Sequence, residues 1–468
     1  MIDSAPARVP QAQPRSRTWT SRPLGKVLLA TGAALLLLTG ALNVRALLDS
    51  DRDAGRDQLV PISGRAELDL DKRIATLQER LGRAPTSADA TALGLAYLQK
   101  TRETGDPSYY PKAEALFDQA LEAQPTDVEA MIGQGGLALA RHDFAAALEW
   151  GESAQALAPR KASVYGVIGD ARIELGRYDA AIATFQTMVD LRPDMASFAR
   201  VSYARELTGD LPGAIEAMER AAQAGSGNAE NMAWTRVQLG NLQVASGDLA
   251  AAERHYQTAL AVVPGYVYGH AGIGRVAIAR GDLEAAIVAY TAASEVMPLP
   301  EFVIILGDLY TATGQPERAA DQYALVDAMR ALFAGNGVNI DLEMALFAAD
   351  HGREPQETLA LAGARYSAAP SIGAADVLAW VRYQNGDYAG AADASREALR
   401  LGTRDPLMHF HAGLIEAAVG NPSAASAHLR TALEINPHFS VRYAPVALAA
   451  LETLEAGEEL THPVRANG

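Results

Sequence analysis

The chain has 468 residues, a formal net charge of −16 and no cysteine. A chain without cysteine holds no disulfide framework, no thiolate zinc site, no cysteine nucleophile and no acylated lipoprotein cysteine. The excess of acidic residues argues against general nucleic-acid binding, because neutralising phosphates needs a basic face. Arginine outnumbers lysine 35 to 5, and this usage, together with the abundance of alanine, indicates a bacterial source with a GC-rich genome.

Three segments precede the first amphipathic helix. Residues 1–26 contain several prolines and five basic residues against one acidic residue, which predicts a disordered tail. Residues 27–44 carry no charge, and as a helix about 27 Å long they match the hydrocarbon core of a bilayer. The basic tail before this run predicts a cytoplasmic N-terminus and an extracytoplasmic remainder. Residues 45–65 are charged and polar, which predicts a linker.

The apolar run at 27–44 allows three interpretations. A signal anchor fits its length, which exceeds the usual apolar region of a signal peptide. A cleaved signal peptide is the second, because Thr39 and Ala41 offer a weak small-x-small cleavage site. A buried core helix is the third, although an uncharged run of this length beside a basic tail is unusual in a soluble domain. We therefore predict a single-pass transmembrane signal anchor.

A capping helix is expected at residues 66–85. Its leucine and isoleucine residues approximate one helical stripe, at Leu68, Leu70, Ile74, Leu77 and Leu81. The first helix pair follows, and its turn at 101–110 is longer than those of later pairs. Insertions of this kind are expected on an exposed edge of a repeat array.

A glycine recurs along residues 86–438 in steps of 33, 38, 34, 33, 38, 34 and 34 residues, and His142 stands at the equivalent turn one step earlier. Gly247 ends one short helix there, and Asp248 is a suitable N-cap for the next. The period predicts ten helix pairs, the eighth of which is degenerate at 328–370, with a capping helix and tail at 439–468. The recurring glycines are Gly176, Gly209, Gly247, Gly281, Gly314, Gly352, Gly386 and Gly420.

The residues around these turns resemble the tetratricopeptide repeat family. Its pattern has Leu-Gly and an aromatic residue in the first helix, then a small residue, an aromatic residue, an alanine and a proline in the second. The first part is matched at Leu93, Gly94, Tyr97 and at Leu306, Gly307, Tyr310, and the second at Ala252, Tyr256, Ala259 and Pro264. Gly151 and Ser395 depart from it, standing where an aromatic residue is usual. The resemblance implies an all-α, right-handed superhelical solenoid of helix-turn-helix repeats.

By the same resemblance, the first helices of the pairs line a concave surface that binds peptides. The candidate groove residues are Asp170, Glu174, Tyr203, Glu206, Trp234, Asn241, Tyr268, Arg275 and Asp308. The carboxylate clamp of chaperone-binding members needs lysine in these helices, and no lysine occurs after Lys161. An acidic surface with aromatic residues between the charges would suit a basic or polar extended peptide. Alternatively, the carboxylates form a solvated face with no ligand.

No catalytic motif accompanies the repeats. The chain lacks a phosphate-binding P-loop, a H-E-x-x-H zinc motif and a G-x-S-x-G nucleophile elbow. His270 and His409 occupy positions of core residues, without clustered partners for a metal. No segment outside the repeats is long enough for a catalytic domain. We therefore predict a protein that is not an enzyme and has no cofactor.

These observations predict a membrane-anchored scaffold that binds a partner protein or peptide on the extracytoplasmic side, in the periplasm or at the cell surface. Three alternatives stay open. The chain is a periplasmic or secreted adaptor if the signal is cleaved, or it is the accessory subunit of an envelope enzyme complex. The third alternative is a structural protein that forms oligomers through contacts between the degenerate eighth pair and a second copy of the chain.

Mass spectrometry of the mature N-terminus separates the anchored form from the cleaved form. We expect the intact residues 27–44 to remain on the protein recovered from membranes, because their length fits an anchor. A mature chain that starts near Leu42 would have lost the anchor and would establish the soluble adaptor instead.

Overall fold

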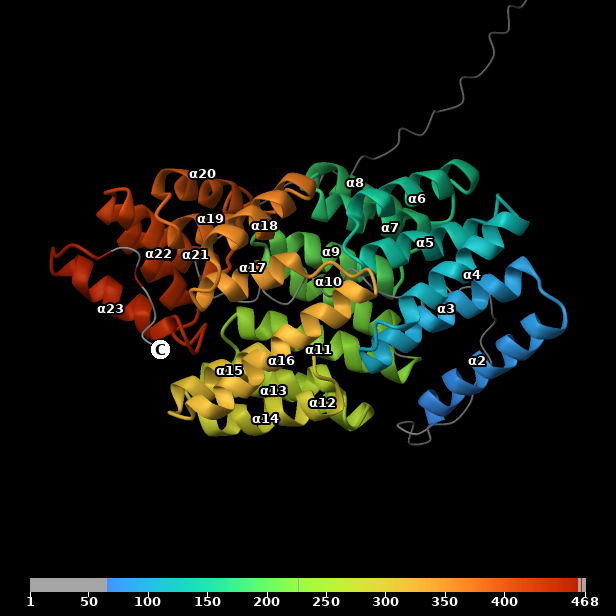
Figure 1. The fold of residues 1–468 in the computed structure, drawn as a ribbon, viewed down its shortest axis with the longest axis horizontal. Helices are drawn as coiled ribbons and strands as arrows, with labels where there is room; N and C mark the ends of the chain where they lie inside the picture. Colours follow the sequence, from blue (N-terminus) through green and yellow to red (C-terminus); the bar gives the residue numbers. More distant parts are fainter. Residues whose placement is uncertain (1–64, 226, 462–463, 465–468) are drawn as a thin grey trace, which may run out of the picture.

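All the secondary structure that the computed structural model describes is helical. The model describes residues 65–225, 227–461 and 464, and within these ranges there are twenty-two α-helices and no strand. Figure 1 shows the helices stacked side by side along a curved path. The all-α solenoid predicted from the sequence is confirmed.

The helices form ten antiparallel pairs between two single helices. α2 (Arg65–Arg83) precedes the pairs and packs on the first of them, and α23 (Ala444–Glu455) packs on the last. In chain order the pairs are α3 (Ser87–Thr104) with α4 (Tyr109–Ala123), α5 (Val128–Ala140) with α6 (Phe144–Leu157), α7 (Ala162–Glu174) with α8 (Tyr178–Leu191), α9 (Met195–Leu207) with α10 (Leu211–Ala224), α11 (Ala229–Ala245) with α12 (Leu249–Val262), α13 (Val267–Ala279) with α14 (Leu283–Val296), α15 (Pro300–Ala312) with α16 (Pro316–Gly335), α17 (Asp341–Asp350) with α18 (Pro355–Ala368), α19 (Ile372–Gln384) with α20 (Tyr388–Ala398), and α21 (Pro406–Ala418) with α22 (Pro422–Ile435).

None of the described helices is long and apolar enough to cross a bilayer. The predicted tail at 1–26 and the predicted anchor at 27–44 lie outside the described residues, as does the predicted linker up to residue 64. The membrane anchor therefore stays a prediction.

In five of the ten pairs the turn follows from two residues, as the fifth pair shows. Gly247 has a φ of 82°, and its N–H donates to the carbonyl of Val244 at 3.0 Å, which ends α11. The next residue, Asp248, accepts a hydrogen bond from the Ala251 N–H at 2.8 Å and caps α12. Equivalent aspartate caps start four other second helices, at Asp143, Asp210, Asp282 and Asp387.

In five of the second helices an aromatic ring packs against a glycine of a first helix. The ring of Tyr256, which is fully buried, lies against Gly240 of its own pair and Gly272 of the next. A Cβ at either glycine would stand 2.3–2.4 Å from the ring. Phe117 lies between Gly94 and Gly133 in the same way. Glycine at these positions is therefore required by the close approach of the ring to the helix backbone.

Successive turns of the superhelix touch along a line of contacts that we call the seam. The hairpin turns of the first four pairs lie against the connections that follow the sixth to ninth pairs. The Ile372 N–H donates to the Tyr178 hydroxyl at 2.7 Å across 194 residues, and the Asn339 N–H donates to the Arg141 carbonyl at 3.1 Å. In Figure 1 the seam brings α17 and α18 beside the helices from α5 to α9. One superhelical turn therefore contains between five and six pairs.

The seam has an apolar core of its own. Ile173 and Leu207 from the third and fourth pairs share one cluster of buried residues with Ile372 and Met408. Ala369 belongs to the buried cluster around α6 and α7. Burying apolar surface is the main favourable term in folding, so the contact between superhelical turns is part of the folded core.

The longer turn of the first pair does not lie on an exposed edge, and that prediction is wrong. Its first residues extend α3 to Thr104, and Pro107 is buried. A Cβ at Gly105 would stand 2.8 Å from the Met297 side chain, which belongs to the connection after the sixth pair. The insertion lengthens the first pair so that it reaches the seam.

The degenerate eighth pair also borders the seam. The helix before it, α16, has 20 residues, whereas α17 has only 10. The connection between them carries Asn339, whose carbonyl lies 2.6 Å from Nδ1 of His142. His142 has a φ of 60°, the left-handed conformation that glycine takes in the other turns. Its side chain makes a contact that glycine cannot make.

Replacing a seam glycine should cost more stability than replacing a glycine in an open turn. Gly176 and Gly386 both have positive φ, but a Cβ at Gly176 would stand 2.3 Å from the Pro370 carbonyl oxygen, whereas one at Gly386 meets nothing within 4 Å. We expect Gly386→Ala to lower the free energy of unfolding by about 1 kcal/mol and Gly176→Ala by about 2–4 kcal/mol. Thermal unfolding followed by circular dichroism measures both, and equal midpoints for the two variants would contradict a close-packed seam.

Candidate functional site

The nine predicted groove residues all lie on first helices of five consecutive pairs, from α7 to α15. None of them is fully exposed, and Glu174 is only 9% exposed. We call the inward side of the first helices the interior face. Here each side chain keeps some contact with solvent while protein surrounds it on several sides.

Asp170 is held by a neighbouring arginine. Nε and one terminal nitrogen of Arg200 donate to its two carboxylate oxygens at 2.8 and 2.6 Å. The other terminal nitrogen donates to the Ala196 carbonyl at 3.0 Å. Burial raises the pKa of Asp170, and Arg200 opposes that rise. Both oxygens are occupied, so Asp170 is a structural residue.

Three more candidates belong to internal networks. The side-chain oxygen of Asn241 accepts hydrogen bonds from the Tyr256 hydroxyl at 2.8 Å and from Arg275 at 2.5 Å. Asp308 accepts from the Tyr323 hydroxyl at 2.8 Å, and His351 lies 3.3 Å from the same oxygen. These contacts fix Asn241, Arg275 and Asp308 within the array.

The other two carboxylates have no such partner among the described residues. Burial raises the pKa of Glu174 to about 8, the nearby Asp170 and Glu343 add to the rise, and Arg365 opposes it. Burial also raises the pKa of Glu206 to about 8, where Asp405 adds to the rise and Arg275 opposes it. Near neutral pH both carboxyls are therefore easily converted between the neutral and the charged form.

The three aromatic candidates lie beside these acids. Burial, followed by Glu174, raises the pKa of Tyr203 well above its ordinary value. Trp234 packs on the buried cluster around Leu239. Tyr268 packs edge-on against Phe302 with ring centroids 6.0 Å apart. The interior face thus combines partly buried rings with unpaired acids.

Sequence reasoning missed three charged residues that lie on or next to the interior face. Burial raises the pKa of Glu301 in α15 to about 7, and its Oε1 has no hydrogen-bond partner. Glu343 of α17 and Arg365 of α18 also carry a buried polar atom without a hydrogen bond. Pro300 marks the start of α15 and could have drawn attention to Glu301. The approach of Glu343 and Arg365 to α7 is created by the seam, which no local pattern encodes.

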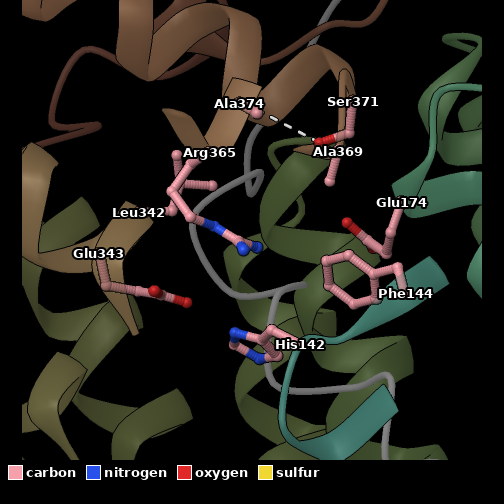
Figure 2. A pocket seen from close by; sticks show the side chains of 9 residues that line it. All are labelled: His142, Phe144, Glu174, Leu342, Glu343, Arg365, Ala369, Ser371 and Ala374. Atoms are coloured by element: carbon pink, nitrogen blue, oxygen red, sulfur yellow. Dashed lines mark hydrogen bonds between the residues drawn. The ribbon is translucent and has the colours of Figure 1, made fainter. Parts of the chain in front are cut away.

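A small cavity lies where these elements meet, and Figure 2 shows its lining. Its volume of about 10 Å³ is close to that of one water molecule. The described residues contain no group of three or more histidines and acids able to hold a metal ion. The lining residues are His142, Phe144, Glu174, Leu342, Glu343, Arg365, Ala369, Ser371 and Ala374.

The model of a known family matches most of the repeats. The tetratricopeptide repeat model matches residues 109–162, 167–229, 237–297, 273–331 and 377–438, more than half of the chain. The chain belongs to the tetratricopeptide repeat family. The unmatched stretch between 331 and 377 contains the degenerate eighth tetratricopeptide pair.

The chain is also similar to solved structures at low sequence identity. The Cut9–Hcn1 hetero-tetramer of APC/C is 13% identical, covers 83% of this chain and 94% of its own, and gives a TM-score of 0.37. The thermophilic protein TTC0263 of Thermus thermophilus is 20% identical, with 44% and 98% coverage and a TM-score of 0.35. The human IFIT1 dimer with m7Gppp-AAAA is 15% identical, with 72% and 78% coverage and a TM-score of 0.45. No curated protein matches the chain.

Removing one member of the Asp170–Arg200 pair should destabilise the tetratricopeptide array. Their side chains are only 11% and 7% exposed, so Asp170→Asn or Arg200→Met leaves a buried charge without its partner. We expect each variant to lower the free energy of unfolding by about 3–5 kcal/mol, and Asp170→Leu combined with Arg200→Met to recover most of the loss. Denaturant unfolding measures all three, and single variants as stable as the wild type would show that the pair has no structural role.

Proposed function

We propose that this chain is a tetratricopeptide scaffold that holds a partner protein through a cationic or polar extended segment on the interior face. Tetratricopeptide repeats typically form non-enzymatic scaffolds for protein interactions. Glu206 and Glu301 support a cationic segment, because both are desolvated acids of the interior face and Oε1 of Glu301 lacks a hydrogen bond. This is the observation that carries the proposal.

The cations of this face are largely engaged already. Arg200 is bound to Asp170, and Arg275 donates to Asn241. A lysine or arginine of an incoming segment would therefore meet acids that lack a strong partner. Attraction between opposite charges is stronger in such a partly desolvated place than at an open surface.

The aromatic residues add a second contribution. Tyr203, Trp234 and Tyr268 line the same side of α9, α11 and α13 and are half-buried. Arginine and lysine are attracted to the faces of such rings. A phosphate carries no positive charge to favour the ionised form of these acids, so the proposed partner is a protein and not a nucleic acid.

We also propose that the scaffold is anchored by residues 27–44 with the repeats on the extracytoplasmic side of a bacterial membrane. The uncharged run and the basic tail before it support this arrangement. The repeats would then meet partners in the periplasm or at the cell surface.

Fluorescence anisotropy with defined peptides tests the charge preference. The full chain in detergent is titrated against a peptide alternating lysine with serine and one of equal length alternating glutamate with serine. We expect the lysine peptide to bind more tightly, and Glu206→Gln with Glu301→Gln to weaken it about tenfold or more, because two buried charge partners are lost.

The exposed Glu284 of α14 provides a matched control, since Glu284→Gln removes a charge away from the interior face. Equal binding of both peptides, or an equal loss with Glu284→Gln, would contradict the proposed site.

A further inference from the structure

Glu174 is an acid at a position where most other pairs carry small or apolar residues. It lies two residues before the turn glycine, and the side chain is 9% exposed with no hydrogen bond among the described residues. Asp350, the equivalent acid of the eighth pair, is satisfied by Trp380 and Tyr443 at 2.8 and 2.6 Å. Five other pairs have alanine there, at Ala140, Ala245, Ala279, Ala312 and Ala418.

The carboxyl of Glu174 points into the small cavity at the seam. Figure 2 shows it on one side, with Arg365 and Glu343 reaching in from the opposite side. These two residues come from α18 and α17, on the next turn of the superhelix. The remaining neighbour from that turn, α19, contributes only the uncharged Ser371 and Ala374.

The groups that face Glu174 from its own superhelical turn are all occupied or neutral. Asp170 is paired with Arg200. Tyr178 accepts the Ile372 N–H, and the hydroxyls of Tyr178 and Tyr203 both hold their protons more firmly than usual, since burial raises their pKa. Nδ1 of His142 lies 2.6 Å from the Asn339 carbonyl and donates a hydrogen bond to the seam backbone.

Charge balance in the cavity thus depends on the protonation of one residue. With Glu174 neutral, the charges of Glu343 and Arg365 compensate each other. Ionisation of Glu174 adds a second negative charge to a cavity that holds about one water molecule. That charge is poorly hydrated in so narrow a space, and separation of α7 from the elements of the next superhelical turn would hydrate it more fully.

We propose that Glu174 acts as a proton-operated latch, in which the neutral carboxyl lets the seam close and the carboxylate drives α7 apart from α17, α18 and α19. Opening would widen access to the interior face. The inference does not depend on the proposed partner, because seam closure is a property of this chain alone.

The direction of the pH effect follows from the two states of Glu174. In the closed seam burial raises the pKa of Glu174 from 4.5 to about 8, whereas in an open seam the hydrated carboxyl would titrate near its ordinary value. Closure is then fully favoured below pH 4.5 and weakens as the pH rises towards 8. The ratio of open to closed molecules rises by at most about tenfold for each pH unit in this range.

Distance measurements between two spin labels across the seam test the latch. The chain has no cysteine, so Ala183→Cys on α8 and Ala364→Cys on α18 place single labels at exposed alanines on either side. We expect one short distance at pH 5 in the full chain, and a longer distance that gains population between pH 6 and 9. A distance distribution that does not change from pH 5 to 9 would overturn the proposal.

The same labels in Glu174→Gln assign the effect to this residue. Glutamine is close to glutamate in size but stays neutral, so we expect the closed distance to persist at pH 9, with an open fraction at least tenfold smaller than in the wild type. The control variant Glu149→Gln changes an exposed residue of the neighbouring α6. Its seam should open with rising pH as in the wild type. A Glu174→Gln protein that opens with the wild-type pH dependence would overturn the proposal.

Discussion

Close packing of second-helix side chains against the backbones of first helices fixes the spacing of the array, most tightly where an aromatic ring lies between two glycines of consecutive first helices. Tyr256 between Gly240 and Gly272 is one example of this contact. Because no side chain separates the ring from either backbone, the distance and angle between neighbouring pairs can vary little. A small rotation repeated at each pair produces the superhelix. The same repetition makes the position of the last pair sensitive to every contact before it.

The seam is the second constraint, and it explains where the chain departs from its period. His142 replaces a turn glycine and contacts Asn339. The lengthened α3 brings Gly105 to Met297, and the irregular eighth pair supplies the connection around Asn339. A left-handed backbone is unfavourable for a residue with a side chain, and the hydrogen bond of His142 offsets that cost. Each of these three irregularities lies where one superhelical turn meets the next.

Much of the fold could be predicted because its determinants are local. Gly247 and Asp248 end and begin helices through contacts within a few residues, and Tyr256 fills a site made by adjacent pairs. The partnership of Asp170 with Arg200 was also within reach, since the two lie about one period apart. Their pairing gives both carboxylate oxygens of Asp170 a partner within the array.

The rest of the interior face could not be predicted. Glu343 and Arg365 approach α7 only because of the pitch of the superhelix, which accumulates over more than five pairs. Periodicity places each residue on its helix but does not say which residues of distant pairs meet across the seam. The membrane anchor stands apart from this problem, because it rests on composition alone and lies outside the described residues.

The seam also changes what kind of repeat protein this is. In an open solenoid each unit contacts only its neighbours, so the array can grow or shrink by whole units. Here the third hairpin turn must meet the connection after the eighth pair. Duplicating or losing one unit between them would present a different connection to every seam residue at once. The array could therefore gain repeats at its ends during evolution, whereas the number of repeats between the contacting units is fixed.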